Sequence, residues 1–374
     1  MKAQKLILLF LLFYNNFITA NTDTLYIQSK ILKEKRAILV SLPNGYDVNN
    51  KSITYPLILT TDGEWHHEIV TKMSELLYQD GLPKMIIASI INLDRNKDLT
   101  ISNTAEFKTS GGALNFYNFI KEELMGELKK KYHVSNHSTL LGHSAGGLFN
   151  VFSLTQNNNP FEAFIAVTPT IRWDNYKLLS DFNTSLLESL SKQDKSFYLS
   201  IGNETGIERL GVTKLDSILS KTNFLNFDYK YKEYPEESHV TVPWKAYFDG
   251  LKHTFKSFHI PDSYSNKEFK FTINYFDTLG EKFDYDKRVP QRIILNRGYK
   301  ELKSKNQKTA IEIFNYFKKE YPKIPIPYSI LGDIYLDQKK YVLAQKHFES
   351  AYKIYPTPYV KNKLNSLLKL INKD

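Results

Sequence analysis

A serine flanked by glycines, Ser144, places the strongest constraint on how this chain folds. It stands in Gly142-His143-Ser144-Ala145-Gly146, after apolar, strand-like residues and before a helix-like segment. Gly-x-Ser-x-Gly in that setting is the sequence form of a nucleophile elbow, a sharp turn that lifts the serine hydroxyl above a sheet edge. The glycines let neighbouring backbone pass without a Cβ clash. The motif therefore predicts a nucleophilic serine, with an ordinary small-residue turn as the alternative.

The residues around this turn predict an α/β fold. Short apolar runs alternate with helical segments, which favours a mostly parallel sheet covered by helices on both faces. Ligands bind beyond the carboxyl ends of the strands in such sheets. The expected strands are 23–31, 36–41, 55–60, 85–91, the run that ends at Ser144, 161–167, 197–201 and 227–233; the expected helices include 68–78, 113–131, 180–190 and 240–255.

Two further side chains follow predicted strands and complete a catalytic pattern. A serine hydroxyl is a weak nucleophile unless a base removes its proton, and His239, in the last strand-to-helix connection, is the best-placed base. Glu204 is the leading acid for orienting its imidazole. The order Ser, acid, His is that of α/β-hydrolases. Asp216, Glu208 and Glu237 remain alternatives for the acid, as does a dyad without an acid.

The loop after the 55–60 strand is expected to complete an oxyanion hole. One donor would be the backbone N–H of Ala145, next to the nucleophile, and the other that of Gly63 or Glu64. Trp65 follows directly and would form a wall of the substrate pocket, with ordinary core packing as the alternative.

The sequence argues against metal or cofactor chemistry. It contains no cysteine, so thiolate ligands and disulfides are excluded. His66 and His67 are adjacent and do not point to the same side of a helix. No His-Glu-x-x-His cluster and no glycine-rich phosphate loop occur. We therefore expect neither a metal nor a cofactor.

The first 20 residues predict export. Lys2 and Lys5 precede an apolar run over 6–14, and Ala20 closes a short segment that is typical of a signal-peptide cleavage site. An uncleaved anchor is the alternative. The expected location is secreted or periplasmic. The net charge of +10 comes from scattered lysines, which is typical of a solvated surface and gives no reason to expect nucleic-acid binding. A mildly positive surface would still attract an anionic substrate.

The C-terminal part of the sequence contains a repeat. Gly298, Ala310, Phe314, Tyr321 and Pro322 recur 34 residues later as Gly332, Ala344, Phe348, Tyr355 and Pro356. That period and pattern are typical of tetratricopeptide repeats. We predict a small all-α region over 291–374, joined to the α/β domain of 21–260 by a linker or extension at 261–290. The repeats would bind a protein partner or support the catalytic domain.

Several motifs in fixed order resemble the family of putative esterases. This α/β-hydrolase group includes esterase D, enterobactin-type siderophore esterases, feruloyl esterases and mycolyltransferases, and the resemblance covers roughly residues 25–257. The motifs are Gly111-Gly112-Ala113, Glu122-Glu123-Leu124, Tyr132, Gly142 to Phe149, Thr168-Pro169-Thr170 with Trp173, and Glu237-Ser238-His239.

The resemblance implies roles for particular residues. It assigns nucleophile and base to Ser144 and His239, and places Glu204 where relatives often have Asp. Arg95 to Thr100 resembles a loop near the site of siderophore-esterase-like members, with Ile101 in place of a proline. It thereby adds Arg95 and Trp173 to the expected substrate pocket.

The sequence supports three hypotheses about function. The first is a carboxylic-ester hydrolase that works through an acyl-enzyme on a small ester, for which a siderophore or other aryl ester is the attractive candidate. The second is an acyltransferase of the same fold, since water and an alcohol compete for one acyl-enzyme. The third is a scaffold that works through its repeats, against which the intact elbow and His239 argue.

Overall fold

The computed structural model describes residues 22–50 and 53–371. The predicted signal peptide, 1–20, lies outside these residues. The chain forms two compact units: the first extends to His259 and includes Phe283–Asp286, and the second comprises Ile260–Lys282 and Lys287–Asp374. No helix of the described part is both long enough and apolar enough to cross a membrane.

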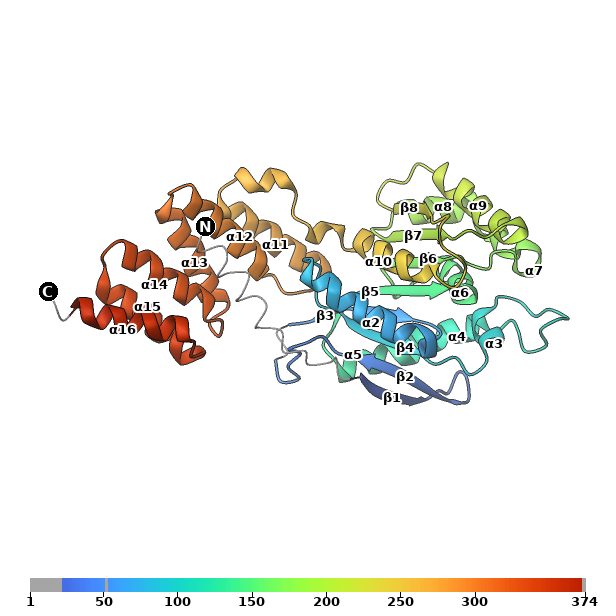
Figure 1. The fold of residues 1–374 in the computed structure, drawn as a ribbon. Helices are drawn as coiled ribbons and strands as arrows, with labels where there is room; N and C mark the ends of the chain where they lie inside the picture. The colour runs from blue at the N-terminus through green and yellow to red at the C-terminus, as the bar shows by residue number, and fades with distance from the viewer. Residues whose placement is uncertain (1–21, 51–52, 372–374) are drawn as a thin grey trace. The chain divides into compact units, whose positions relative to one another are not determined.

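The first unit is built on a sheet of eight strands in the described residues, in the order β1-β2-β4-β3-β5-β6-β7-β8. β1 pairs with β2, and β2 with β4, in antiparallel fashion, whereas all pairs from β4 to β8 are parallel. The sheet confirms the expected α/β class (Figure 1). The strands are β1 (Thr22–Gln28), β2 (Lys35–Ser41), β3 (Tyr55–Thr60), β4 (Ile86–Ile90), β5 (Val134–His143), β6 (Ala163–Val167), β7 (Ser196–Ile201) and β8 (Asp228–Glu233).

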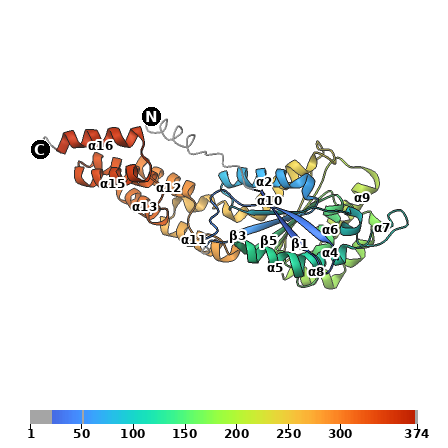
Figure 2. The same ribbon diagram turned by 90° about the horizontal axis from the view of Figure 1, so that it is seen from below.

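The central strands are buried because helices cover both faces of the sheet. Every residue of β3, β4 and β6 is buried, which explains their continuous apolar runs. Figure 2 shows α2 and α10 on one side of the sheet and α4, α5 and α6 on the other. The helices of this unit are α2 (Gly63–Gln79), α3 (Arg95–Leu99), α4 (Ala113–Phe119), α5 (Met125–Lys131), α6 (Ala145–Leu154), α7 (Trp173–Tyr176), α8 (Thr184–Ser191), α9 (Gly206–Ser220) and α10 (Val242–Thr254).

The helix expected over 113–131 contains a π-helical turn. Residues Ile120–Leu124 adopt it between α4 and α5. Such turns interrupt α-helices locally. The carboxylate of Glu123, within the turn, accepts hydrogen bonds from the Ser29 hydroxyl at 2.5 Å and from the Lys30 backbone N–H at 2.9 Å. This part of the helix is thereby tied to the residues that follow β1.

The segment 261–290, expected as a linker or extension, is largely helical. It contains a 3₁₀ turn (Asp262–Asn266) and α11 (Phe269–Phe283). Phe269, Phe276, Leu279 and Phe283 are buried. Their spacing of seven, three and four residues has the period of one helix face, but the Asn, Asp and Lys residues between them obscured it. At the end of α11, Phe283 packs in the first unit, its ring 4.6 Å from that of His137.

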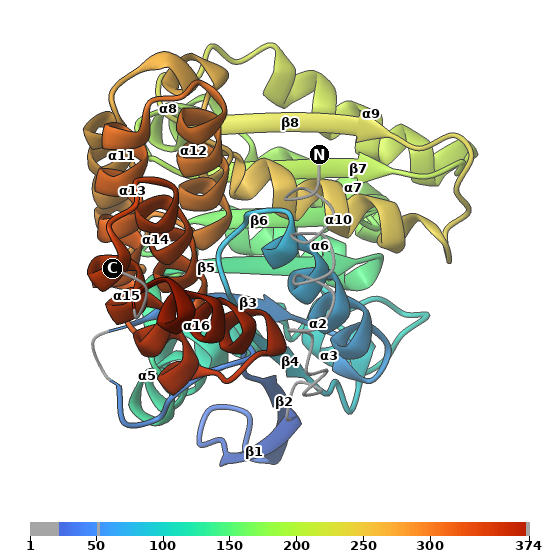
Figure 3. The ribbon, with the colours of Figure 1, turned by 60° about the vertical axis from the view of Figure 1, so that its left-hand side comes forward.

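The second unit is helical in its described part. α12 (Gln291–Lys303) pairs with α13 (Gln307–Glu320), α14 (Ile326–Asp337) pairs with α15 (Tyr341–Ile354), and α16 (Pro358–Ile371) packs on α15. Figure 3 shows α14, α15 and α16 side by side. Two helix pairs and a closing helix are compatible with the predicted repeats, whose tetratricopeptide identity stays a prediction.

The repeated glycines have the same packing role in both helix pairs. A Cβ at Gly298 would overlap the ring of Phe314, and a Cβ at Gly332 would lie 2.8 Å from the ring of Phe348. Both phenylalanines are fully buried. The 34-residue spacing of these positions therefore reflects equivalent contacts between the paired helices.

We expect Gly298→Ala to lower the free energy of unfolding of the second unit by about 1–3 kcal/mol, because it overpacks a buried ring. Gly126→Ala is the matched control, because a Cβ there meets no atom within 4 Å. This control should raise stability by about 0.5–1 kcal/mol through helix propensity. Thermal denaturation followed by circular dichroism measures both. Equal effects of the two substitutions would contradict the packing explanation.

Candidate active site

Ser144 occupies the sharp turn that the sequence predicts. It joins β5 to α6 with φ 58° and ψ −117°, in a region that residues other than glycine rarely adopt. The turn is fixed by hydrogen bonds from the Ser144 N–H to the Val167 carbonyl at 3.0 Å and from the Thr170 N–H to the Ser144 carbonyl at 3.1 Å. Strain of this kind persists where the surroundings over-determine the backbone, as they do at nucleophile elbows.

The two flanking glycines are required by close backbone approach. A Cβ at Gly142 would overlap the Gly146 carbonyl, and a Cβ at Gly146 would overlap the Thr61 hydroxyl. The second contact brings the start of α6 against the end of β3. It therefore places the residue after Ser144 next to the loop expected to supply the second oxyanion donor.

Glu204 and His239 are brought together although 35 residues separate them in sequence. Glu204 follows β7, and His239 lies between β8 and α10. The Nδ1–H of His239 donates to Oε1 of Glu204 at 2.8 Å, since an ionised carboxylate only accepts. The other ring nitrogen, Nε2, is left to exchange a proton, which is the arrangement of a triad.

Burial alone would raise the pKa of Glu204, but the hydrogen bond from His239 and neighbouring backbone and hydroxyl groups hold it below its ordinary value. Glu204 is therefore ionised at neutral pH. An ionised acid keeps the proton of His239 on Nδ1 and stabilises the imidazolium that forms during proton transfer. Of the acids considered from the sequence, Glu204 is the one whose carboxylate bonds to His239 within the described residues.

His239, the candidate base, lies beside the turn that carries Ser144. The ring of His239 packs against the ring of His143, the residue before Ser144, with centroids 4.5 Å apart. The Ser144 hydroxyl lies 3.4 Å from the Thr170 hydroxyl, and no hydrogen bond joins it to His239 within the described residues. Catalytic hydrogen bonds in ligand-free enzymes are often long and tighten when substrate binds.

The predicted oxyanion donors lie at two helix starts. Ala145 is the first residue of α6, and Gly63 and Glu64 are the first two of α2. The N–H groups of a first helical turn have no carbonyl one turn earlier to bind. The N–H of Asp62 is different, because it donates to the Asn92 side chain at 2.8 Å. The start of α2 thus offers the N–H groups of Gly63 and Glu64 to an oxyanion, whereas that of Asp62, the residue before the helix, is already bonded.

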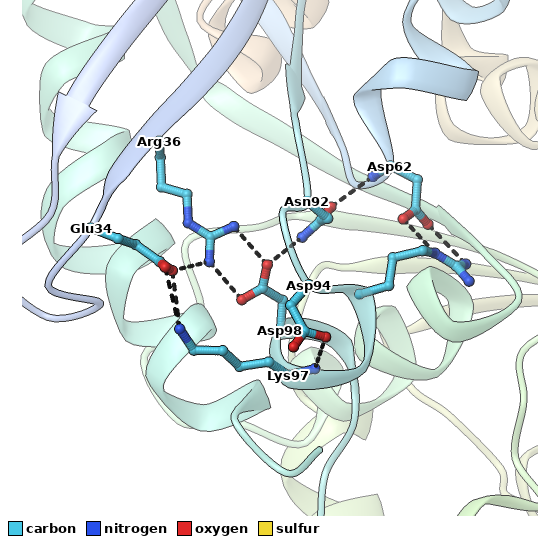
Figure 4. Close-up of polar contacts among 8 residues, drawn as sticks. Glu34, Arg36, Asp62, Asn92, Asp94, Lys97 and Asp98 are labelled. Atoms are coloured by element: carbon cyan, nitrogen blue, oxygen red, sulfur yellow. Dashed lines mark hydrogen bonds and ion pairs between the residues drawn. The ribbon is translucent and has the colours of Figure 1, made fainter. Parts of the chain in front are cut away.

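A buried polar network holds this loop in place (Figure 4). Asp62 has a left-handed backbone with φ 53°, and Arg95 donates to both its carboxylate oxygens, at 2.6 and 3.1 Å. Asn92 links the Asp62 backbone to Asp98, to which its side-chain N–H donates at 2.9 Å. Arg36 donates twice to Asp98, at 2.6 and 2.7 Å. Burial raises the pKa of Asp62, while Arg95 opposes the shift.

Sequence reasoning missed Arg36, Asn92 and Asp98 as supports of the site. Arg36 and Asp98 are almost inaccessible to solvent, at 0% and 1% exposure. A charged residue directly before the apolar run of β2 was the available signal, because buried arginines are rare unless paired. Its partner could not be read from the sequence, because Asp98 lies 62 residues away.

The three expected pocket residues differ in their surroundings. Trp65 is exposed, and the guanidinium of Arg95 lies 5.1 Å from the centre of its ring. Trp173 is buried, donates to the Ser102 carbonyl at 3.2 Å and packs on Phe107. Trp65 and Arg95 are therefore accessible to a ligand, whereas the contacts of Trp173 position the loop that follows α3.

We expect Glu204→Gln to lower kcat by about 10²- to 10⁴-fold while leaving KM within a few-fold, because a neutral amide can stabilise the wrong tautomer of His239. Glu208→Gln is the matched control, since Glu208 pairs with Arg172 and not with His239. Steady-state kinetics on a chromogenic ester measures both. If Glu204→Gln retained the parent kcat, Glu204 would not be the orienting acid.

Comparison with known proteins finds similarity to esterases. A family model described as "Putative esterase" matches residues 29–255. Ferri-bacillibactin esterase BesA of Bacillus subtilis is 34% identical over 90 residues, 24% of this chain and 30% of that protein. Siderophore enterobactin esterase of Emericella nidulans is 38% identical over 74 residues, which are 19% of this chain and 24% of that protein. The matches thus span less than a third of either relative.

Solved structures share the fold. An IroE-like serine hydrolase from Shewanella oneidensis has a TM-score of 0.67 at 23% identity, over 79% of this chain and 98% of that one. The BES protein from Bacillus cereus has a TM-score of 0.58 at 25% identity, over 64% and 97%. An uncharacterised protein from Capnocytophaga ochracea has a TM-score of 0.63 at 15% identity, over 93% and 100%, so its similarity includes helices beyond the first unit.

Proposed function

This chain belongs to the putative esterase family, and on that premise we propose that it is a serine carboxylic-ester hydrolase acting through an acyl-enzyme. The observation that carries the proposal is the hydrogen bond between Glu204 and His239, made beside the strained turn at Ser144. The proposed nucleophile, base and acid follow three different strands. If one of these residues had only a structural role, the other two would not be needed beside it.

The geometry supports a two-step reaction. The Ser144 Oγ attacks the acyl carbon while Nε2 of His239 takes its proton. The carbonyl oxygen becomes an oxyanion that accepts hydrogen bonds from Ala145 and from Gly63 or Glu64. His239 then gives its proton to the departing alcohol oxygen. In the second step His239 takes a proton from water, the hydroxide adds to the acyl carbon, and Ser144 leaves with the proton.

For the substrate we propose an ester of the siderophore type that carries aryl groups. Two relatives are named as esterases of ferri-bacillibactin and of enterobactin. Trp65 offers an exposed aromatic face at the catalytic edge, and Arg95 lies against it. The net charge of +10 would attract an anionic ester. Reaction outside the cytoplasm, in the periplasm or after secretion, follows from the predicted signal peptide and belongs to the same proposal.

The test compares ester classes on the purified protein. Its substrates are p-nitrophenyl acetate and butyrate, a feruloyl ester and a catecholate trilactone, and a fluorophosphonate probe is used to label the nucleophile. We expect turnover of all four esters, the highest kcat/KM for the trilactone, and the probe on the peptide that contains Ser144. Absence of both turnover and labelling would refute the hydrolase proposal. Turnover in which the feruloyl ester exceeds the trilactone would refute the siderophore assignment alone.

A further inference from the structure

His143, the residue between the elbow glycine and the nucleophile, contacts the base itself. Its ring and that of His239 have centroids 4.5 Å apart and planes inclined at 46°. We propose that His143 is a positioning residue whose imidazole fixes the tilt of the His239 ring, and this inference rests on the proposed function. The hydroxyl of Ser144 reacts, and His143 acts only through His239.

The base needs this second support because its own loop exposes it. The side chain of His239 is 45% exposed, whereas Glu204 is only 8% exposed. The hydrogen bond at Nδ1 fixes the distance between the ring and the carboxylate, but a single bond of this kind leaves the ring free to rotate about its axis. Contact with His143 on the ring face restrains that rotation. Orientation matters here, since a misplacement of about 1 Å can cost roughly 10²-fold in rate.

His143 is itself held by a stack of buried rings. The ring of His66, from α2, meets His143 edge-on at 5.7 Å, and Tyr247, from α10, meets His66 edge-on at 5.5 Å. His66 is 6% exposed and Tyr247 is fully buried. This ring stack, Tyr247–His66–His143–His239, crosses from the helices on one face of the sheet to the catalytic loop. It connects the base to rigid parts of the fold.

The stack is built by ring contacts, and the imidazole of His143 also makes a hydrogen bond with the backbone of His239. Both ring nitrogens of His66, Nε2 of His143 and the hydroxyl of Tyr247 are buried and have no hydrogen-bond partner among the described residues. Leaving buried polar atoms unpaired costs free energy. Edge-to-face aromatic contacts provide favourable packing of defined geometry. Packing of the rings, together with the hydrogen bond between His143 and the His239 backbone, therefore sets the orientation of the stack.

Burial and nearby charges keep the rings of His143 and His66 uncharged. Burial, followed by the charges of His239, His66 and Arg95, lowers the pKa of His143 to about 3. Burial, followed by Arg95, lowers that of His66 to about 4. The charge of Asp62 partly offsets that of Arg95, and Glu204 pairs with His239. Both rings are therefore neutral from about pH 5 upward, and the imidazolium that forms on His239 meets no second imidazolium.

The experiment compares three substitutions by kcat and KM on p-nitrophenyl butyrate. His143→Phe keeps a ring, whereas His143→Gln keeps length without a ring and His143→Ala removes both. We expect the Gln and Ala variants to lose about tenfold or more in kcat with KM within twofold. His143→Phe should stay within about threefold of the parent in kcat.

The outcomes separate this role from a merely structural one. Parent kcat in His143→Gln would overturn the inference, as would a loss in His143→Phe equal to that in His143→Gln. If His143→Ala does not fold, the Phe and Gln pair makes the same comparison. His259→Ala, a substitution of an exposed histidine that contacts Asp80, is the control and should match the parent. An active Ser144→Ala variant would instead refute the proposed function.

Discussion

Replacing Ser144 by alanine is expected to reduce kcat for ester hydrolysis by about 10⁴- to 10⁶-fold, the range seen when a triad nucleophile is lost. Without the hydroxyl no acyl-enzyme forms. The proposed oxyanion donors at Ala145 and at Gly63 or Glu64 remain, so a small residual rate above that of water should persist. Initial rates on p-nitrophenyl acetate, at enzyme concentrations high enough to detect a weak activity, measure the effect.

The substitution should leave the fold intact. The positive φ of this turn costs serine and alanine a similar free energy. The substitution also removes one long hydroxyl contact, that between Ser144 and Thr170. Ser180→Ala, on an exposed 3₁₀ turn, is the matched control. We expect both variants to melt within about 2 °C of the parent, a shift that corresponds to about 1 kcal/mol or less. Activity of Ser144→Ala equal to that of the control would disprove its assignment as nucleophile.

Replacing Arg36 by methionine is expected to lower the free energy of unfolding of the first unit by about 3–5 kcal/mol. The substitution leaves the carboxylate of Asp98 buried without the two hydrogen bonds that it receives from Arg36. Removing one partner of a buried ion pair is costly for that reason, even where the pair itself adds little net stability. The apolar part of methionine fits the space of the arginine stem, so the loss should reflect the charge.

Urea denaturation followed by tryptophan fluorescence measures this change, because all three tryptophans, Trp65, Trp173 and Trp244, lie in the first unit. Lys72→Met is the control. Lys72 pairs with Glu75 at 3.2 Å on an exposed helix surface, where such pairs contribute about 0.3–0.5 kcal/mol. A loss below about 1 kcal/mol in Arg36→Met, similar to the control, would show that the buried network contributes little to stability.

Most of the fold was predictable from local pattern. Continuous apolar runs identified β3, β4 and β6, because a parallel strand covered on both faces needs apolar residues at every position. The position of Ser144 was also predictable, since only a Gly-x-Ser-x-Gly turn meets the backbone and steric demands of an elbow. The helix α11 was not, because polar residues at its exposed positions masked the spacing of its buried face.

The supports of the candidate site could not be predicted. Arg36 and Asp98 come together across 62 residues, and Asn92 connects them to the backbone of Asp62. His66 was considered from the sequence only as a metal ligand, yet its ring packs against His143. No spacing rule links such residues, because their proximity depends on how the strand order places β2, β3, β4 and β5.

The sequence by itself determined the fold class, the nucleophile turn and the chain order Ser144, Glu204, His239, since each depends on residue type over short distances. Only the tertiary structure decided that Glu204 is the acid that bonds to His239, that Asp62 does not offer its N–H to an oxyanion, and that His143 contacts the base. These facts depend on side-chain directions at strand ends far apart in the chain, and packing of the whole sheet and its helices sets those directions.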